Sequence, residues 1–309
     1  MKTLAVYHKQ LGDTLLLQPA LAKLACQDGE DVGLITRPGF EPVVELMPGV
    51  RPVTWRSAPR VERLFAYDSG DRSTMATTWV SARRKHLLIF SDFYVRFFHP
   101  WLFHDISFRD QMQDYRGRYF WEITPGDSDH GFEPPQLCQP PSTWIPQAAQ
   151  QQAFIVIHPT SAWKRKCWAA ERWIEIVAKI RKVSNFPIVL TGGGSEWERV
   201  LCDEIAASCR DGDVMNLGGR TSLREIIGII SKSSMVLTVD GFVSHLAQAY
   251  RRPCVTLFGA TNANHWHIET EHSKAVFEGE NPLSKTKTME GITIEDVWAV
   301  TVPMLDGAT

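Results

Sequence analysis

Residues 216–262 constrain the fold more than any other part of this sequence, because they alternate between helical and strand patterns. Ser222 and Glu225 stand at the spacing of a capping box, in which each side chain hydrogen-bonds the backbone of the other residue. Four apolar side chains then recur at helical spacing, at Leu223, Ile226, Ile227 and Ile230. This pattern predicts an amphipathic helix over residues 221–232.

The rest of this stretch predicts a strand, a polar loop, a second helix and a second strand. Apolar runs over 235–239 and 254–258 are typical of buried strands, and a short helix is expected between them over 242–250. Such alternation indicates an α/β fold. Because ligands of open α/β sheets bind beyond the carboxyl ends of the strands, the loop from Asp240 to His245 is the first candidate site.

Length and charge limit the classes of protein to which the chain can belong. At 309 residues it is long enough for two domains, and its net charge of -2 provides no basic field of the kind that nucleic-acid-binding proteins carry. The six cysteines form no Cys-x-x-Cys pair, and the first apolar run is too short for a signal peptide. We therefore expect a cytoplasmic protein with no nucleic-acid partner. The sequence also lacks the run of about 18 apolar residues that a membrane span requires.

The N-terminal half opens with a strand, a loop and a helix. We expect the strand over 3–7, and Asp13 stands at the N-cap position of the helix that follows. Residues 87–108 carry many aromatic side chains, which indicate either a core helix or a partly exposed surface for an amphiphilic partner. Three further elements are expected: a strand over 32–36, a helix over 41–47 and a strand over 52–55.

A proline-rich stretch separates the two halves of the chain. Residues 124–152 contain six prolines and show little periodicity, so they are expected to link a domain of residues 1–145 to a domain of residues 153–309. The second half then repeats the opening of the first, with a strand over 154–157, a helix marked by Trp173, Ile176, Val177 and Ile180, and a strand over 188–191. Each half is therefore expected to form its own doubly wound sheet.

The loop HPTSAWKRKCW joins the first strand of the second half to its first helix. It offers hydroxyl groups and cations in a position suited to a bound phosphate or diphosphate, where a lysine neutralises negative charge. A solvated basic loop explains the same composition equally well. The residues concerned are Thr160, Ser161, Lys164, Arg165 and Lys166.

A glycine-rich turn, Thr191 to Gly194, follows the next strand. A dinucleotide fingerprint would need a glycine at Trp197, so the pattern disfavours a nicotinamide or flavin enzyme. Glu196 and Glu198 follow the turn and are suited either to ribose hydroxyls or to the first turn of a helix, where acids complement the dipole.

Asp13 has two interpretations, as a helix N-cap and as a general base. His158 and His245 have no second metal-binding side chain at ligand spacing, so structural hydrogen bonding is the favoured reading and no metal site is expected. Neither a Gly-x-Ser-x-Gly elbow nor a His-Glu-x-x-His motif is present, which leaves hydrolase and metalloprotease functions without support.

Four motifs in this order resemble glycosyltransferase family 9, the lipopolysaccharide heptosyltransferase family. They are LGDTLLLQPAL, the loop HPTSAWKRKCW with its Lys-x-Trp, the turn GGGSEWE, and the run from NLGGRTSL to VTLFGATN. The resemblance implies the GT-B fold, in which two Rossmann-like doubly wound domains face an interdomain cleft. It also implies an inverting, metal-independent glycosyltransferase without a cofactor, which moves a sugar, typically heptose from ADP-heptose, onto a lipopolysaccharide-type or other glycan acceptor.

The resemblance also implies roles for individual residues and a cellular location. The acceptor, a glycan or glycolipid, would bind the N-terminal domain and the nucleotide-sugar donor the C-terminal domain, in the cytoplasm or peripherally at the inner face of the cytoplasmic membrane. Asp13 matches the proposed base, and Glu196 the acid that binds the donor ribose. The donor diphosphate would be bound by Thr160, Ser161, Lys166, Asp240, Gly241, Phe242 and His245. The acceptor side is assigned to His8, Lys9, Arg60 and Arg63.

One departure from the family pattern concerns the diphosphate loop. The family usually has Asp-Ser/Thr-Gly where this chain has Asp240-Gly241-Phe242, which removes a hydroxyl and introduces a bulky ring. Either Gly241 takes the close-approach role or the donor binds differently or poorly. Two alternatives therefore stay open: a non-catalytic nucleotide-binding protein that retains the fold, and a family member with another nucleotide-sugar donor.

Overall fold

The computed structural model divides the chain into two compact units, Met1–Cys138 and Gln139–Thr309, and each is described by itself. The described residues are 1–89, 101–108, 115–126, 131–147, 153–210, 212–279, 286 and 288–306.

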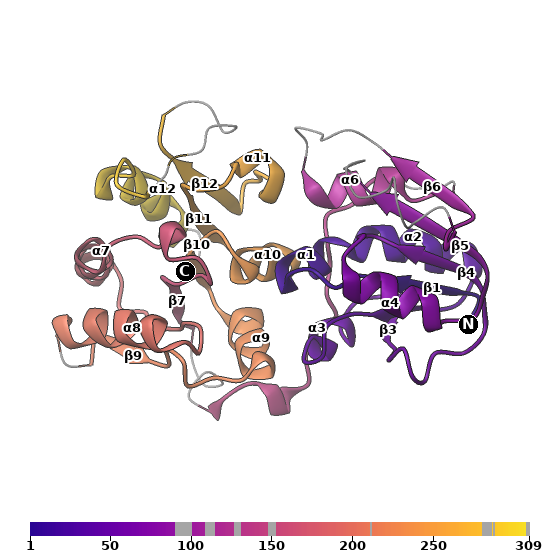
Figure 1. Cartoon of the computed structure of the whole chain (residues 1–309). Coiled ribbons are helices and arrows are strands. Elements are labelled where there is room, and N and C mark those ends of the chain that lie inside the picture. Colours follow the sequence, from indigo (N-terminus) through magenta and orange to yellow (C-terminus); the bar gives the residue numbers. More distant parts are fainter. Residues whose placement is uncertain are drawn as a thin grey trace. The chain divides into compact units, whose positions relative to one another are not determined.

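The first unit contains a six-stranded parallel sheet of order β3-β2-β1-β4-β5-β6 (Figure 1). Its order reverses between β1 and β4, so the loops that follow these two strands flank the switch point of a doubly wound sheet. The strands are β1 (Thr3–Val6), β2 (Val32–Ile35), β3 (Val50–Pro52), β4 (Val61–Ala66), β5 (Ala82–Ile89) and β6 (Asp105–Phe108).

Helices cover this sheet and bury small or apolar side chains against it. Helix α4 packs on β1 and β4 and buries Ser73, Ala76 and Thr77, while α1, α2 and α6 pack on one another. Helices α1 and α2 are separated at Leu17, which leaves Pro19 in the first turn of α2, where its missing N–H removes no helical hydrogen bond. The helices are α1 (Leu11–Leu16), α2 (Gln18–Asp28), α3 (Glu41–Val44), α4 (Asp71–Trp79) and α6 (Arg116–Ile123).

The second unit repeats the same topology, with a six-stranded parallel sheet of order β12-β11-β10-β7-β8-β9. Its switch point lies between β7 and β10. The strands are β7 (Ile155–His158), β8 (Ile188–Leu190), β9 (Val214–Asn216), β10 (Met235–Val239), β11 (Cys254–Phe258) and β12 (Ser273–Phe277). Both sheets are doubly wound, which confirms the prediction of two Rossmann-like domains.

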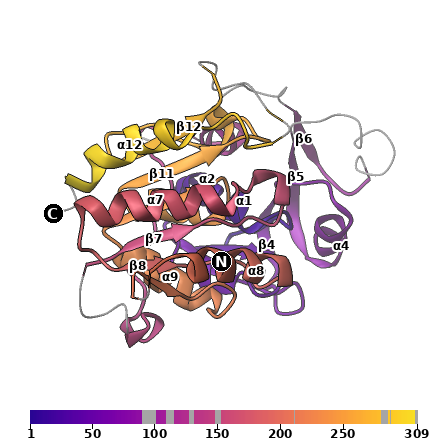
Figure 2. The ribbon, with the colours of Figure 1, turned by 90° about the vertical axis from the view of Figure 1, so that its left-hand side faces the viewer.

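Three helices of the second unit, α7, α8 and α12, lie side by side, as Figure 2 shows, and α9 packs on α10. The core between these helices and the sheet is built around the buried rings of Trp168 and Trp173. The helices are η1 (Ser142–Trp144), η3 (Lys164–Lys166), α7 (Ala170–Val183), α8 (Glu196–Ser208), α9 (Leu223–Lys232), α10 (Phe242–Ala249), α11 (Ala263–Trp266) and α12 (Ile294–Asp306).

The capping box expected at Ser222 and Glu225 is present. The Glu225 N–H donates to Ser222 Oγ at 3.3 Å, and the Ser222 N–H donates to Glu225 Oε2 at 2.7 Å. Helix α9 therefore begins at Leu223, and the buried strands β10 and β11 have the bounds that the sequence predicts.

Two expectations in the first unit are wrong in detail. Gln10 is the N-cap of α1, and Asp13 lies three residues later in the first turn, so Asp13 does not cap the helix. The third strand is β3, which begins at Val50 and pairs with β2 only as far as Pro52, opposite Leu34. It does not reach residue 55, because residues 55–57 form a turn in which the Ser57 N–H donates to the Thr54 carbonyl at 3.1 Å. In the aromatic segment 87–108, residues 87–89 belong to β5, residues 101–104 lie before β6, and residues 105–108 form β6. Residues 90–100, including Arg96 and His99, lie outside the described residues.

Candidate functional site

The switch point of the second unit brings two polar loops to the same edge of the sheet. Strands β7 and β10 are adjacent and parallel, so the loop after His158 and the loop that begins at Asp240 both leave from their carboxyl ends. Ligands of doubly wound sheets bind at this position.

An ion pair joins these two loops. Lys166 Nζ lies 2.6 Å from Asp240 Oδ2, and the two side chains are 15% and 4% exposed. The same carboxylate oxygen accepts a hydrogen bond from the Thr261 hydroxyl, in the loop after β11. Asp240 Oδ2 is therefore engaged by two neighbours, and its effect is to hold the ammonium group of Lys166 in place at the sheet edge.

The turn that carries Lys166 is anchored by the tryptophan of the Lys-x-Trp motif. Trp168 is buried, its indole N–H donates to the Ile292 carbonyl at 3.1 Å, and its ring meets Trp173 edge-on with centroids 5.3 Å apart. The ammonium of Lys166 also lies 4.9 Å from the centre of the Trp163 ring. Buried aromatic packing on one side and the ion pair on the other thus fix the position of Lys166.

Thr160 and His158 connect the loop after β7 to the loop after β8. Thr160 is buried and its hydroxyl accepts the Gly193 N–H at 3.0 Å, and His158 Nδ1 is hydrogen-bonded to the Thr191 hydroxyl at 2.9 Å. Burial lowers the pKa of His158 to about 4, which favours a neutral ring. Ser161 is half-buried and follows Thr160 toward the loop of Gly241.

Gly241 leaves open space in front of helix α10. Its φ of 175° is ordinary extended backbone, and a Cβ at this position would meet nothing closer than Ser161 Oγ at 3.9 Å and the Val239 carbonyl at 4.0 Å. Phe242 is the first residue of α10 and is half-buried. The first turn of the helix provides backbone N–H groups and the positive end of a dipole, both of which favour an anion.

Two buried polar atoms in this region have no hydrogen-bond partner among the described residues. They are Nδ1 of His245, in α10, and Oδ1 of Asn262, which precedes α11. Burial lowers the pKa of His245 to about 4, against the opposite effect of the nearby Asp240 charge. Because buried polar groups are almost always paired, these two atoms are suited to contact a substrate.

The two glutamates after the glycine turn have different environments. Glu198 forms a capping box with Ser195, whose hydroxyl donates to Glu198 Oε2 at 2.6 Å, and its carboxylate occupies the space that a Cβ on Gly193 would need. Glu196 is exposed and lines a pocket of about 520 Å³. The pocket is also lined by Lys164, which lies in the loop after β7, and by other residues of α8. Only Glu196 is therefore available to a ligand.

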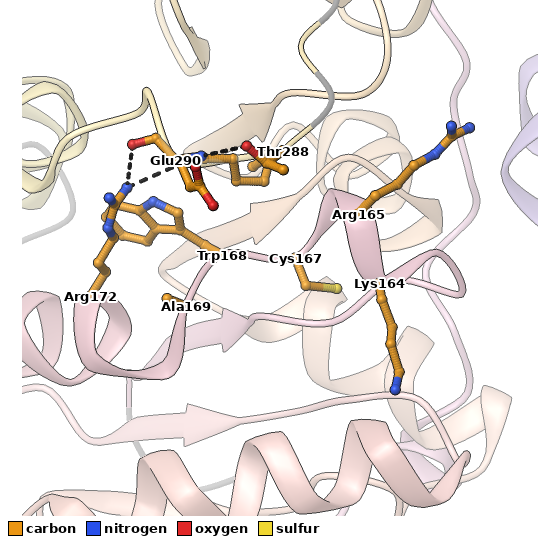
Figure 3. A pocket seen from close by; sticks show the side chains of 9 residues that line it. Lys164, Arg165, Cys167, Trp168, Ala169, Arg172, Thr288 and Glu290 are labelled. Atoms are coloured by element: carbon orange, nitrogen blue, oxygen red, sulfur yellow. Dashed lines mark hydrogen bonds between the residues drawn. The ribbon is translucent and has the colours of Figure 1, made fainter.

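A second pocket, of about 300 Å³, is lined in part by Lys164 and Arg165 of the turn Lys164–Lys166 (Figure 3). Arg172 is committed to backbone carbonyl groups there, including that of Glu290 at 2.9 Å. Figure 3 shows Lys164 and Arg165 extending in different directions from the same turn. The cations of this pocket therefore do not converge on one point.

The first unit has a corresponding arrangement at its own switch point. Asp68, just after β4, accepts the backbone N–H of His8, just after β1, at 2.9 Å. Burial, followed by the charges of Asp13 and Asp68, raises the pKa of Tyr7 well above its ordinary value, and Asp13 is hydrogen-bonded to the Tyr7 hydroxyl. Two carboxylates and His8 therefore lie near the carboxyl end of β1, and Lys9 continues the same loop.

Arg60 and Arg63 do not join this group. Arg60 is exposed and precedes the first residue of β4, at the amino end of the strand. Arg63 lies within β4, and its guanidinium forms an ion pair with Asp28.

Sequence reasoning assigned no role to Asp68, Ser73, Thr261 or Asn262. A signal for Asp68 exists, because it follows a buried strand closely, as Asp240 does. Thr261 and Asn262 belong to the loop after β11, and only the sheet order shows that β11 adjoins β10.

The described residues contain neither a metal cluster nor a membrane-spanning helix. Within these residues no group of three or more His, Cys, Asp or Glu side chains is arranged to hold a metal ion. No helix in the described part of the chain is both long and apolar enough to cross a bilayer.

Comparison with known proteins identifies the family. A 160-residue stretch is 29% identical to lipopolysaccharide heptosyltransferase 3 of Escherichia coli strain K12 and covers 49% of this chain and 46% of that protein, so the chain spans about half the length of the curated relatives it matches.

Two solved structures share the fold across nearly the whole chain. The structure of E. coli ADP-heptose lipopolysaccharide heptosyltransferase II is 16% identical, with a TM-score of 0.81, and covers 99% of both chains. The E. coli heptosyltransferase WaaC, solved with ADP, is 17% identical, with a TM-score of 0.77, and covers 100% of both. The sequence model of glycosyltransferase family 9 (heptosyltransferase) matches residues 135–293, which is more than half of the sequence. The chain has the two-domain GT-B fold and belongs to glycosyltransferase family 9.

Proposed function

We propose that this protein transfers heptose from ADP-heptose to a lipopolysaccharide-type acceptor, with inversion and without a metal ion. The observation that carries this proposal is the ion pair of Lys166 and Asp240, which fixes a cation at the switch point in front of α10. The names of the relatives support the sugar and the acceptor, and the structure of WaaC with ADP supports the nucleotide.

The donor diphosphate is proposed to bind the second unit, within the domain of residues 153–309. Lys166 Nζ would contact the phosphate oxygens and neutralise the charge that develops as the diphosphate departs. The backbone N–H groups that begin at Gly241 and Phe242 would add further donors, and Ser161 lies close to Gly241. Asp240 would act through Lys166 as a positioning residue, since a carboxylate in direct contact with phosphate would repel it.

Three further residues are proposed to orient the donor. His245 Nδ1 and Asn262 Oδ1 are buried polar atoms without a partner among the described residues, so contact with the donor would satisfy them. Glu196 is exposed in the first turn of α8 and would accept hydrogen bonds from the ribose hydroxyls. Thr160 would support the loop through its hydrogen bond to Gly193.

The acceptor is proposed to bind the first unit, within the domain of residues 1–145, near His8 and Lys9. Asp13 would take the proton of the attacking hydroxyl as that hydroxyl displaces the diphosphate in a single step, which inverts the anomeric centre. A carboxylate in the first turn of a helix is a weak base, and it suits a late proton transfer from a hydroxyl that becomes acidic as it attacks.

The chain has Asp240-Gly241-Phe242 where the family usually has Asp-Ser/Thr-Gly, and this difference favours a second candidate function, a protein that binds a nucleotide without catalysis. The open space beside Gly241 supports donor approach and hence the enzyme. A thermal-shift panel with ADP, UDP, GDP, CMP and NAD tests the donor site, because a ligand at 100 times its dissociation constant adds about 2.7 kcal/mol of stability. Selective stabilisation by ADP is expected. Preference for UDP, GDP or CMP would indicate another donor, and no shift with any nucleotide would contradict donor binding.

We also propose that the protein acts in the cytoplasm and touches the inner face of the cytoplasmic membrane. Trp55, Met75 and Trp79 are 37%, 53% and 69% exposed, and the two indole rings lie 6.1 Å apart. Arg56 lies over the Trp55 ring, and Arg60, Arg83 and Arg84 are also exposed. Exposed tryptophan beside arginine suits an anionic lipid surface.

A further inference from the structure

A chain of three side chains runs through the loops of the first unit. The Ser73 hydroxyl, on the buried face of α4, donates to Asp68 Oδ2 at 2.6 Å, and His8 Nδ1 lies 2.9 Å from Ser73 Oγ. Asp68 also accepts the N–H groups of His8 and Gly70, each at 2.9 Å. Asp68 is 5% exposed. The four hydrogen bonds together hold Asp68, Ser73 and the loop of His8 in place, and the bond at Nδ1 orients the His8 ring.

The direction of these hydrogen bonds determines the tautomer of His8. A serine hydroxyl carries one proton, and the proton of Ser73 is given to the carboxylate of Asp68, which in its ionised form can only accept. Ser73 Oγ must then accept from His8, so the proton of the neutral imidazole lies on Nδ1. The second ring nitrogen, Nε2, is left with a lone pair.

Nε2 of His8 has no hydrogen-bond partner among the described residues, and the side chain is half-buried rather than closed off. It lies on the loop that follows β1, five residues before Asp13. The Tyr7 hydroxyl, next to His8 in the chain, is close to the carboxylates of both Asp13 and Asp68. Nε2 is therefore a hydrogen-bond acceptor on the loop that leads from β1 to the helix of the proposed base.

We propose that His8 Nε2 accepts a hydrogen bond from a hydroxyl group of the acceptor sugar and so orients the acceptor for transfer. This inference rests on the proposed function. Ser73 and Asp68 are positioning residues, because they act through His8. The proton that the acceptor hydroxyl loses in the reaction still goes to Asp13. His8 favours an acceptor that has a second hydroxyl group within hydrogen-bond distance of Nε2.

Burial, together with two nearby guanidinium groups, favours the neutral form of the His8 ring. Burial lowers the pKa of His8, the Asp68 carboxylate raises it, and the guanidinium groups of Arg72, on α4, and Arg37, after β2, lower it. Lys9 adds a further positive charge on the same loop. The balance is a downward shift from the ordinary value of about 6.5. Nε2 therefore keeps its lone pair at neutral pH and becomes a donor only in acid.

Nitrogen-15 NMR of the full chain with labelled histidine tests the tautomer without any transfer reaction. The resonances of His8 are identified by their loss in His8→Gln. A protonated Nδ1 and an unprotonated Nε2 are expected at pH 7.5, and Ser73→Ala should mix the two tautomers. The control Thr78→Ala removes an exposed hydroxyl from the same helix and should leave the signals unchanged. A proton on Nε2 in the wild type would overturn the proposal.

Titration with a deacylated lipopolysaccharide core oligosaccharide then tests the contact itself. The Nε2 resonance should move on binding, and the dissociation constant should rise about tenfold in His8→Asn, whose amide reaches only as far as Nδ1. His8→Gln places an amide near the Nε2 position and should retain most of the affinity. Binding by the wild type should weaken as the pH falls through the pKa of His8.

Saturation with the oligosaccharide that leaves Nε2 unmoved would overturn the proposal, as would equal affinities of the two His8 variants. Binding without any transfer of heptose would instead contradict the proposed reaction and leave the contact at His8 standing.

Discussion

The ammonium group of Lys166 lies 2.6 Å from the carboxylate of Asp240, so the loop after the first strand of the second sheet is tied to the loop after the fourth. The first unit repeats this relationship, because Asp68, after its fourth strand, accepts the N–H of His8, after its first strand. In both units a buried carboxylate beside the switch point therefore fixes the loop that is expected to meet a substrate.

Lys166→Gln should weaken ADP binding by about ten- to a hundredfold, because a hydrogen bond to a charged group contributes roughly 1.5 to 3 kcal/mol. The matched control is Lys164→Gln, which removes an exposed cation from the same short turn and should change the affinity by less than about threefold. Isothermal titration of both variants with ADP measures the difference. Equal losses would mean that the turn attracts ADP only through its overall charge.

Gly241→Ser should fold normally and bind ADP more tightly than the wild type by several-fold. The backbone there is extended and a Cβ meets no close neighbour, so the new hydroxyl adds a donor without strain. The free energy of unfolding, measured with urea, should differ from that of the wild type by less than about 0.5 kcal/mol. Gly193→Ala is the contrasting variant, since its Cβ meets the Glu198 carboxylate and should destabilise the protein by about 1 to 3 kcal/mol. Weaker ADP binding by Gly241→Ser would show that the glycine is needed for close approach.

The stability of the protein should fall as the pH drops from about 6.5 toward 4. Burial lowers the pKa of His245 to about 4, whereas in the unfolded chain it titrates near 6.5, so the unfolded state binds the proton first. The contribution of His245 alone to this loss is at most about 1.4 kcal/mol per pH unit, or roughly 2 kcal/mol at pH 5. Urea unfolding of the wild type and of His245→Gln at pH 7.5 and pH 5 measures this, and the variant should show the smaller fall. Equal falls would exclude His245 as a source of acid sensitivity.

The exposed aromatic side chains of the first unit should bind anionic lipid. Sedimentation with vesicles of phosphatidylglycerol and phosphatidylethanolamine should retain the wild type, and Trp55→Ser with Trp79→Ser should reduce binding by at least about tenfold. Val183→Ser, which removes a side chain of 57% exposure from the second unit, is the control. Unchanged binding by the double variant would rule out this surface.

Local pattern predicts much of this fold, and long-range geometry explains the rest. The strands β10 and β11 and the capping box at Ser222 follow from side chains close together in the sequence. The bounds of β3 depend on the register of its ladder with β2, which ends at Leu34 and Pro52, and α1 begins after Gln10 although Asp13 is the better capping residue.

The candidate site divides in the same way. Lys166 and Asp240 stand out in the sequence because they lie in polar loops after buried strands, but their mutual contact, 74 residues apart, appears only in the fold. Asn262 and Ser73 give no comparable signal. An asparagine in a loop and a serine in a helix are common, and burial beside the switch point is what makes them informative.

The most direct test of the proposed function is mass spectrometry of a deacylated lipopolysaccharide core oligosaccharide after incubation with the protein and ADP-heptose. The wild type should add the mass of one heptosyl residue and release ADP. Asp13→Asn should bind ADP normally and transfer about a hundred- to ten-thousandfold more slowly, the usual contribution of a general base. No gain in mass with a wild-type protein that binds ADP would contradict the transferase function, and wild-type rates in Asp13→Asn would contradict Asp13 as the base.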